Sequence, residues 1–200
     1  MAPIDQARAP RRRGFLRDRA GGATVEFMVL LAPLFALLFF VVEVAIFIFH
    51  SESVRKAAEV GARLAIVSPP VVLGLPPTNA PAESGDEGHC ALEPSPCATP
   101  DPARWSCAGG TGEGCTASFD AIVAEMRRFS RAIEPQNVTV TYVYGRLGRV
   151  GGPLVPTVIV DVADVTNPFG AFGLRQLIFG GVRFETVPDV RANFVAEDLN

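Results

Sequence analysis

The sequence predicts an α+β protein with a single long N-terminal transmembrane helix and a small antiparallel sheet. Three observations predict it: an apolar stretch at residues 27–49, later segments that alternate apolar and polar side chains, and four cysteines grouped beyond the apolar stretch. A chain of 200 residues suits one modest domain with an anchor rather than a multidomain enzyme. We expect a basic arm at residues 1–21, a transmembrane helix with its extension at residues 22–67, and an extracytoplasmic α+β domain with a cysteine-stapled loop at residues 68–200.

The N-terminal arm is strongly basic, although the whole chain has a net charge of −3. Its charged residues are Arg8, Arg11, Arg12, Arg13, Arg17 and Arg19, opposed only by Asp5 and Asp18. A basic arm can bind nucleic acid, but its position directly before an apolar stretch favours retention on the cytoplasmic side of a membrane. We therefore expect no nucleic-acid partner, a bacterial inner-membrane location, a cytoplasmic N-terminus and a periplasmic C-terminal domain.

Residues 27–49 form the candidate membrane span. At about 1.5 Å per residue, a helix over this range covers a hydrocarbon core of about 30 Å. The apolar part of a secretory signal peptide is shorter, about 7–15 residues, and is followed by a cleavage site with small residues. The membrane is therefore the first expected partner, and this segment is expected to remain as a single-pass anchor.

Pro33 and Glu43 are the candidate interaction residues inside the membrane. Pro33 cannot donate a hydrogen bond to the carbonyl of Val29, so a kink is expected there. Glu43 is the only ionisable residue of the span, and a carboxylate inside a bilayer is costly unless it is paired or neutral. It either binds a basic group on another membrane component or lies protonated or extended towards the outer headgroups.

The helix is expected to continue beyond the membrane to Val67 and to end before Pro69-Pro70. Glu52 with Lys56, and Glu59 with Arg63, have the i,i+4 spacing of ion pairs. Another face carries small residues that allow a sheet or a second helix to approach closely. They are Val54, Ala57, Ala58, Gly61, Ala62 and Ala65.

The region at residues 69–117 is rich in Pro, Gly, Ser and Thr and is predicted to be a long loop held by its cysteines. The cysteines are Cys90, Cys97, Cys107 and Cys115. Their even number and their position outside the membrane predict two disulfides, with three possible pairings. The spacings C-x6-C, C-x9-C and C-x7-C lack the close pairs of a zinc site, so no metal is expected.

The rest of the chain is predicted to form one helix and three strands. An apolar face at residues 118–133 predicts the helix. The strands are expected at residues 137–144, 157–165 and 183–195, with Pro188 marking an edge or a bulge in the last. The apolar residues 168–181 are expected to form a short helix or a loop that faces a partner.

Two segments resemble a known family. The chain reads Arg19-Ala-Gly-Gly-Ala-Thr-Val-Glu-Phe27 before the span and Val54-Arg-Lys-Ala-Ala-Glu-Val-Gly-Ala-Arg63 after it. Both are similar to the TadE/TadG-like family of tight-adherence pilus assembly proteins, which is pseudopilin-like. The resemblance implies a structural role in the biogenesis of a Flp-type pilus and in adhesion. It also implies partnership with other pilus assembly proteins and pilins.

The resemblance further implies a processing site made of Gly21, Gly22, Glu26 and Phe27. A prepilin peptidase would cut after Gly21 and leave Glu26 at the fifth mature position. A glycine allows close approach of the protease to the backbone, and Glu26 could pair with the new amino terminus of a neighbouring subunit. The alternative is that the glycines only separate arm from helix and that Glu26 favours the helix N-terminus. TadG-like relatives need no such cleavage, so both remain open.

No catalytic motif accompanies these features. The histidines are His50 and His89, and neither lies in a known catalytic pattern. Asp161 and Asp164 would point to opposite faces of a strand. We expect no enzyme activity, no cofactor and no small-molecule substrate. The main rival to a pilus role is an unprocessed, membrane-anchored binding module, and an anchored enzyme is the weaker rival.

Overall fold

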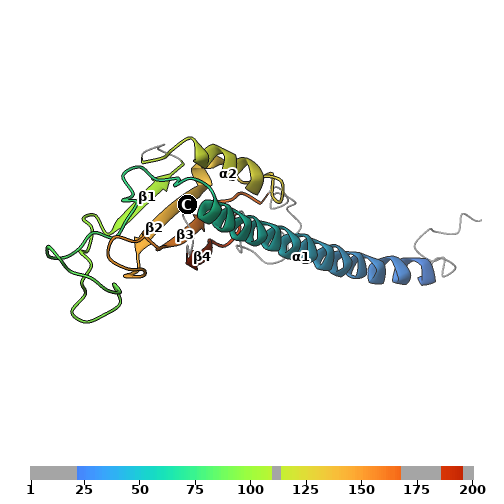
Figure 1. Ribbon diagram of the computed structural model, residues 1–200. Coiled ribbons are helices and arrows are strands. Elements are labelled where there is room, and N and C mark those ends of the chain that lie inside the picture. Colours follow the sequence, from blue (N-terminus) through green and yellow to red (C-terminus); the bar gives the residue numbers. More distant parts are fainter. Residues whose placement is uncertain (1–21, 110–113, 168–185, 196–200) are drawn as a thin grey trace, which may run out of the picture. The chain divides into compact units, whose positions relative to one another are not determined.

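Figure 1 presents a computed structural model that describes residues 22–109, 114–167 and 186–195. The elements are α1 (Gly22–Val67), β1 (Arg104–Ala108), α2 (Ser118–Met126), the short 3-10 helix η3 (Pro135–Asn137), β2 (Val138–Tyr144), β3 (Pro156–Val162) and β4 (Val190–Val195). The chain divides into two compact units, residues 1–42 and 43–200. The predicted α+β class is confirmed. The arm and the apolar connection at residues 168–181 lie outside the described residues.

Helix α1 begins at Gly22 and ends at Val67, as the sequence predicts. It remains helical on both sides of Pro33. Within the described part of the chain, it is the one helix whose length and composition allow it to cross a membrane, over Thr24–Val67. The chain therefore carries a candidate single-pass anchor near its N-terminus.

The four strands form one antiparallel sheet in the order β1-β2-β3-β4 (Figure 1). Strands β2 and β3 pair along their full length, with Val140 opposite Val160. Strand β1 was not expected, because its five residues lie in the segment predicted to be a loop. The last strand is shorter than predicted: β4 begins only at Val190, after Pro188, and lies at an edge of the sheet.

One face of the sheet carries the core of the second unit. Alternate residues of β3 point inwards, which gives its regular pattern of buried and half-buried positions. They meet the apolar face of α2 and the small residues of α1. These inward residues of β3 and α2 are Pro156, Val158, Val160, Val162, Phe119, Ile122, Val123 and Met126. The core therefore joins the extension of α1 to the sheet within residues 43–200.

Helix α2 is shorter than the predicted helix at residues 118–133. Beyond Met126 the backbone bonds tighten, because the amides of Arg128 and Phe129 donate to carbonyls only three residues earlier. Phe129 was expected on the buried face but is 44 % exposed, whereas Ile133 is fully buried. The α-helix ends at Met126, and Ile133 is buried by the irregular chain that follows. The helix predicted from the apolar spacing was therefore too long.

The cysteines pair locally, as Cys90–Cys97 and Cys107–Cys115. Their Cα atoms are 5.0 and 4.8 Å apart, which is within the usual range for a disulfide. The second bridge lies beside a short ladder in which Leu73 donates to Gly114 and Thr116 donates to Val71, both at 2.8 Å. Two disulfides were predicted, and the structure selects one of the three pairings.

Removal of the Cys107–Cys115 bridge is expected to destabilise the second unit. A disulfide restricts the unfolded chain, and closure of so short a loop contributes about 2.5 kcal/mol. The double variant Cys107→Ser/Cys115→Ser should lose about this much free energy of unfolding in urea titrations followed by Trp105 fluorescence. A reductant should produce the larger loss in the native protein, because it opens both bridges. Unchanged unfolding in both experiments would contradict the pairing.

Candidate functional site

The predicted processing residues lie at the start of α1. Gly22 is the first helical residue, and Glu26 and Phe27 follow in its first two turns. Glu26 is exposed, and the Phe27 side chain is 60 % exposed. Gly21 lies outside the described residues. The helix therefore presents Glu26 on its surface near its N-terminus, where the positive end of the helix dipole favours a carboxylate.

The first unit presents an apolar helix surface. The 18-residue window that qualifies as a membrane span has no buried residues. Its large exposed side chains include Met28, Leu30, Leu34, Phe35, Leu37, Leu38, Phe39 and Phe40. Soluble proteins rarely expose a continuous apolar surface of this size, whereas lipid tails and neighbouring helices cover it readily. This surface is suited to lateral association in a membrane.

Pro33 and Glu43 lie further along the same helix. Pro33 is exposed, whereas Glu43 is partly buried and takes part in an interaction within the chain. Of the processing residues that the structure describes, Gly22, Glu26 and Phe27 lie on the same helix as Pro33 and Glu43 but nearer to its N-terminus. The binding of Glu43 to another membrane component stays a prediction.

The C-terminal part of α1 packs within the second unit. Val54, Ala57, Ala58, Ala62 and Ala65 are fully buried. A Cβ atom placed on Gly61 would lie 2.6 Å from the sulfur of Met126, so the absence of a side chain permits the close contact of α1 with α2. The small face predicted for this segment is therefore a packing face.

The ion pairs on the charged side of this segment differ from the predicted ones. The ammonium of Lys56 lies 3.1 Å from the carboxylate of Glu59, and Arg55 lies 3.9 Å from the same residue. Arg63 instead lies over the ring of Phe194, 5.9 Å from its centre. Attraction between a cation and an aromatic ring explains this arrangement. Arg55, Glu59 and Arg63 line a 340 Å³ groove between α1 and β4.

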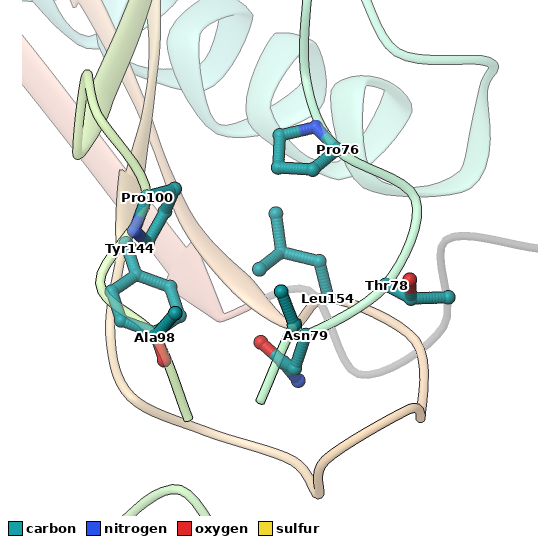
Figure 2. Close-up of a pocket in the computed structure, with 8 residues that line it drawn as sticks. Pro76, Thr78, Asn79, Ala98, Pro100, Tyr144 and Leu154 are labelled. Atoms are coloured by element: carbon teal, nitrogen blue, oxygen red, sulfur yellow. The ribbon is translucent and has the colours of Figure 1, made fainter. Parts of the chain in front are cut away.

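A smaller pocket lies among the loops of the second unit. It encloses 70 Å³ and is lined by Pro76, Thr78, Asn79, Ala80, Ala98, Pro100, Tyr144 and Leu154 (Figure 2). Asn79 is 2 % exposed, yet its side-chain oxygen has no hydrogen-bond partner within the described ranges. The hydroxyl of Tyr144 is also buried, and it has no hydrogen-bond partner among the described residues. Sequence reasoning missed this pocket, because its residues come from separate segments and none belongs to a motif.

Residues with catalytic chemistry are dispersed. His50 is in α1, and His89 lies in the cysteine loop, where its backbone forms an isolated β-bridge with that of Arg149. Asp161 forms an ion pair with Arg191, directly opposite it on the neighbouring strand, at 2.5 Å. Throughout residues 22–109, 114–167 and 186–195, no group of three or more His, Cys, Asp or Glu side chains is placed to hold a metal ion.

Comparison with known families identifies the N-terminal segment. Residues 21–63 match the family described as TadE-like protein, in agreement with the resemblance found in the sequence. No curated protein and no solved structure matches the chain. The match includes Gly21, the apolar surface of α1 and most of the face that packs against α2. The TadE-like segment therefore combines a candidate membrane anchor with part of the core of the second unit.

Proposed function

We propose that this chain is a membrane-anchored, pseudopilin-like structural component of a tight-adherence pilus system, and that it is not an enzyme. The observation that carries the proposal is the match of residues 21–63 to TadE-like proteins. The exposed apolar surface of α1 supports it, because a pilus assembly protein must associate laterally within a membrane. Pilins and other assembly proteins are the proposed partners.

The proposed orientation places the arm in the cytoplasm and residues 68–200 in the periplasm. The arginines before the span favour the cytoplasmic side. The two disulfides support an oxidising location for the opposite side, because disulfides persist in the periplasm but are rare in the cytoplasm. Within this arrangement the protein either stays in the inner membrane or enters the pilus.

The proposed processing step is hydrolysis of the peptide bond between Gly21 and Gly22. It releases the arm with a new carboxylate on Gly21 and leaves an amino terminus on Gly22. That ammonium group can pair with Glu26 of a neighbouring copy, since charges near a membrane interact more strongly than charges in bulk water. Glu26 is exposed in α1, so its carboxylate is available for such a contact.

The direct test is mass spectrometry of the N-terminus after co-expression with a prepilin peptidase. We expect a new terminus at Gly22 that appears only when the active peptidase is present. Gly21→Leu should abolish this product, because a branched side chain prevents close approach of the protease to the backbone. Gly22→Ala is the matched control: cleavage should persist, since the residue before the cut is unchanged.

An intact arm under both conditions would contradict processing. It would favour the second candidate function, an unprocessed single-pass anchor that carries a binding module. The pocket lined by Asn79 and Tyr144 favours this alternative, because it is a hollow in the second unit that lies outside the segment matched to TadE-like proteins. Membrane extraction of pilus components together with the full chain would distinguish the two, since a plain binding module has no reason to accompany them.

A further inference from the structure

Strand β4 lies at one edge of the sheet, and among the described residues it pairs only with β3. Figure 1 shows it beside the C-terminal part of α1. An edge strand presents a row of backbone N–H and C=O groups that can pair with another extended chain. Within the part of the chain that the structure describes, no backbone segment is hydrogen-bonded to the outer edge of β4.

The opposite edge of the sheet is partly covered. There the Cys107–Cys115 bridge ties the segment that follows β1 back against the strand. A Cβ atom placed on Gly114 would lie 2.6 Å from the carbonyl oxygen of Ser106, so the two backbones are in close contact. Of the two edge strands, β4 is therefore the one whose edge is open among the described residues.

The 340 Å³ groove follows this open edge. Its wall includes five successive residues of the strand, residues 190–194. Successive side chains of a strand point to opposite faces, so a hollow lined by all five runs along the edge rather than over one face. Its volume is near the lower end of the range for ligand sites, roughly 300–1,000 Å³. A groove of this size beside a six-residue strand suits an extended peptide.

Helix α1 forms the other wall of the groove. Arg55, Glu59 and Arg63 are spaced by four residues, so they form one stripe along the helix. The helix is fixed against the sheet, because Ala58 and Ala62 are fully buried in the core. When an extended peptide is added to a sheet edge, its backbone supplies affinity and the flanking side chains supply specificity. The stripe on α1 is placed to supply that specificity.

The groove has a surplus of positive charge. Its charged lining residues are three arginines and one glutamate: Arg55, Glu59, Arg63 and Arg191. The Glu59 carboxylate lies 3.1 Å from Lys56, which does not line the groove, and Asp161 pairs with Arg191. Arg63 forms no ion pair within the described ranges. Its guanidinium is therefore available to an incoming carboxylate, which it can bind through two parallel hydrogen bonds.

The spacing of the arginines predicts the pattern of the peptide. Arg55 and Arg63 are eight residues apart, about 12 Å along a helix. Four residues of an extended strand span about 13 Å, and residues four apart lie on the same face. Carboxylates at positions i and i+4 of the peptide would therefore meet both arginines. The residue midway between them would lie opposite Glu59, where a neutral hydrogen-bond donor is preferred.

We propose that this groove binds an extended acidic segment of a partner protein, which adds a fifth strand to the sheet along β4. A polymer with continuous negative charge, such as a nucleic acid, fits less well, because Glu59 interrupts the arginine stripe. The proposal goes beyond the pilus role, since it assigns a docking surface to the second unit. It does not rest on cleavage after Gly21.

The test is fluorescence anisotropy with the full chain in nanodiscs of zwitterionic lipid, which has no net charge to compete with the peptide. The probe is the labelled, end-blocked peptide Thr-Glu-Val-Thr-Val-Glu-Thr. In Thr-Glu-Val-Thr-Glu-Val-Thr the composition is the same, but the carboxylates lie on opposite faces. In Thr-Gln-Val-Thr-Val-Gln-Thr the charge is removed.

We expect saturable binding of the probe, with at least about tenfold weaker binding of both comparison peptides, since each loses a charge-assisted hydrogen bond. Failure of the probe to bind, or equal affinity for all three peptides, would overturn the proposal.

Methylation of the peptide nitrogens tests the strand pairing. In an added strand, alternate N–H groups point towards β4 and the others point away from it. Methylation of one alternate set should abolish binding, whereas methylation of the other set should preserve it. Equal binding of both methylated peptides would show attraction by charge alone and would contradict strand addition.

Two variants locate the binding. Arg63→Gln should weaken the affinity for the probe about tenfold, because a charge-assisted hydrogen bond is lost. Arg131→Gln is the matched control: it removes the same charge from an exposed arginine that does not line the groove, so the affinity should be unchanged. Near-UV circular dichroism verifies that both variants are folded. Unchanged affinity in folded Arg63→Gln, or an equal loss in Arg131→Gln, would place the peptide elsewhere.

Discussion

Gly109→Ala is expected to lower the free energy of unfolding of the second unit by about 3 kcal/mol, at the upper end of the range for an overpacked site. A Cβ atom at this position would collide with the carbonyl oxygen of Pro135 and lie 2.6 Å from the ring of Phe119. The carbonyl belongs to the backbone, so it cannot yield by rotation of a side chain. Relief requires β1 and η3 to separate, which also strains the 3.1 Å hydrogen bond from Gly109 to Val138.

The measurement is urea unfolding of the full chain in nanodiscs, followed by fluorescence. Trp105 is the single tryptophan of the protein and is buried in β1, close to the altered position. Gly145→Ala is the matched control: a Cβ there has only ordinary contacts, the nearest at 3.6 Å, so its effect should stay within about 0.5 kcal/mol. Equal stability of the two variants would show that β1 and η3 do not approach as closely as described.

The bounds of α1 could be predicted because local chemistry determines them. Glycines lie at its start, a continuous run of helix-compatible residues follows, and Pro69-Pro70 prevents its continuation. The paired segments β2 and β3 were also found, since residues 137–144 alternate apolar and polar side chains and the β3 segment is rich in β-branched residues. In these segments the local pattern and the tertiary environment agree, so the sequence alone was sufficient.

Strand β1 was missed for a physical reason. Only Trp105 and Cys107 face inwards, and this pair is too short to reveal an alternation among the surrounding Pro and Gly residues. The strand forms because β2 offers a paired edge, with Trp105 opposite Tyr142. The disulfide pairing was equally hidden, because the three pairings are distinguished only when the backbone brings particular Cα atoms together.

The candidate site was predictable only in part. The proposed processing and intramembrane residues lie in one continuous segment, so a linear pattern was enough to propose them. The loop pocket depends on Asn79, Ala98, Tyr144 and Leu154, which meet only after the sheet and loops have formed. Asn79 in a proline-rich segment reads as an ordinary turn residue until its hydrogen bonds are known. Sites of this type require the fold before they can be found.

Tyr142→Phe is expected to lower the free energy of unfolding by about 2 kcal/mol. The hydroxyl donates to the carbonyl of Ala65 at 2.8 Å and accepts from the amide of Val71 at 3.5 Å. In a longer helix, the amide of residue 69 would satisfy Ala65, but that residue is Pro69 and has no N–H. Tyr142 therefore replaces a hydrogen bond that proline cannot make, and phenylalanine would leave the buried groups unsatisfied.

The charge state of Tyr142 agrees with this role. Burial raises the pKa of its hydroxyl, and the Val71 hydrogen bond partly opposes that rise, so the group remains a neutral donor at physiological pH. Thermal and urea unfolding of Tyr142→Phe should both show the loss of stability.

Tyr144→Phe is the matched control two residues along β2. Its hydroxyl has no described partner, so its removal should leave stability unchanged or slightly higher. A larger loss in Tyr144→Phe than in Tyr142→Phe would contradict the proposed link between β2 and the end of α1. A larger loss of stability in Tyr142→Phe than in Tyr144→Phe would show that Tyr142 connects the sheet to the C-terminal end of α1.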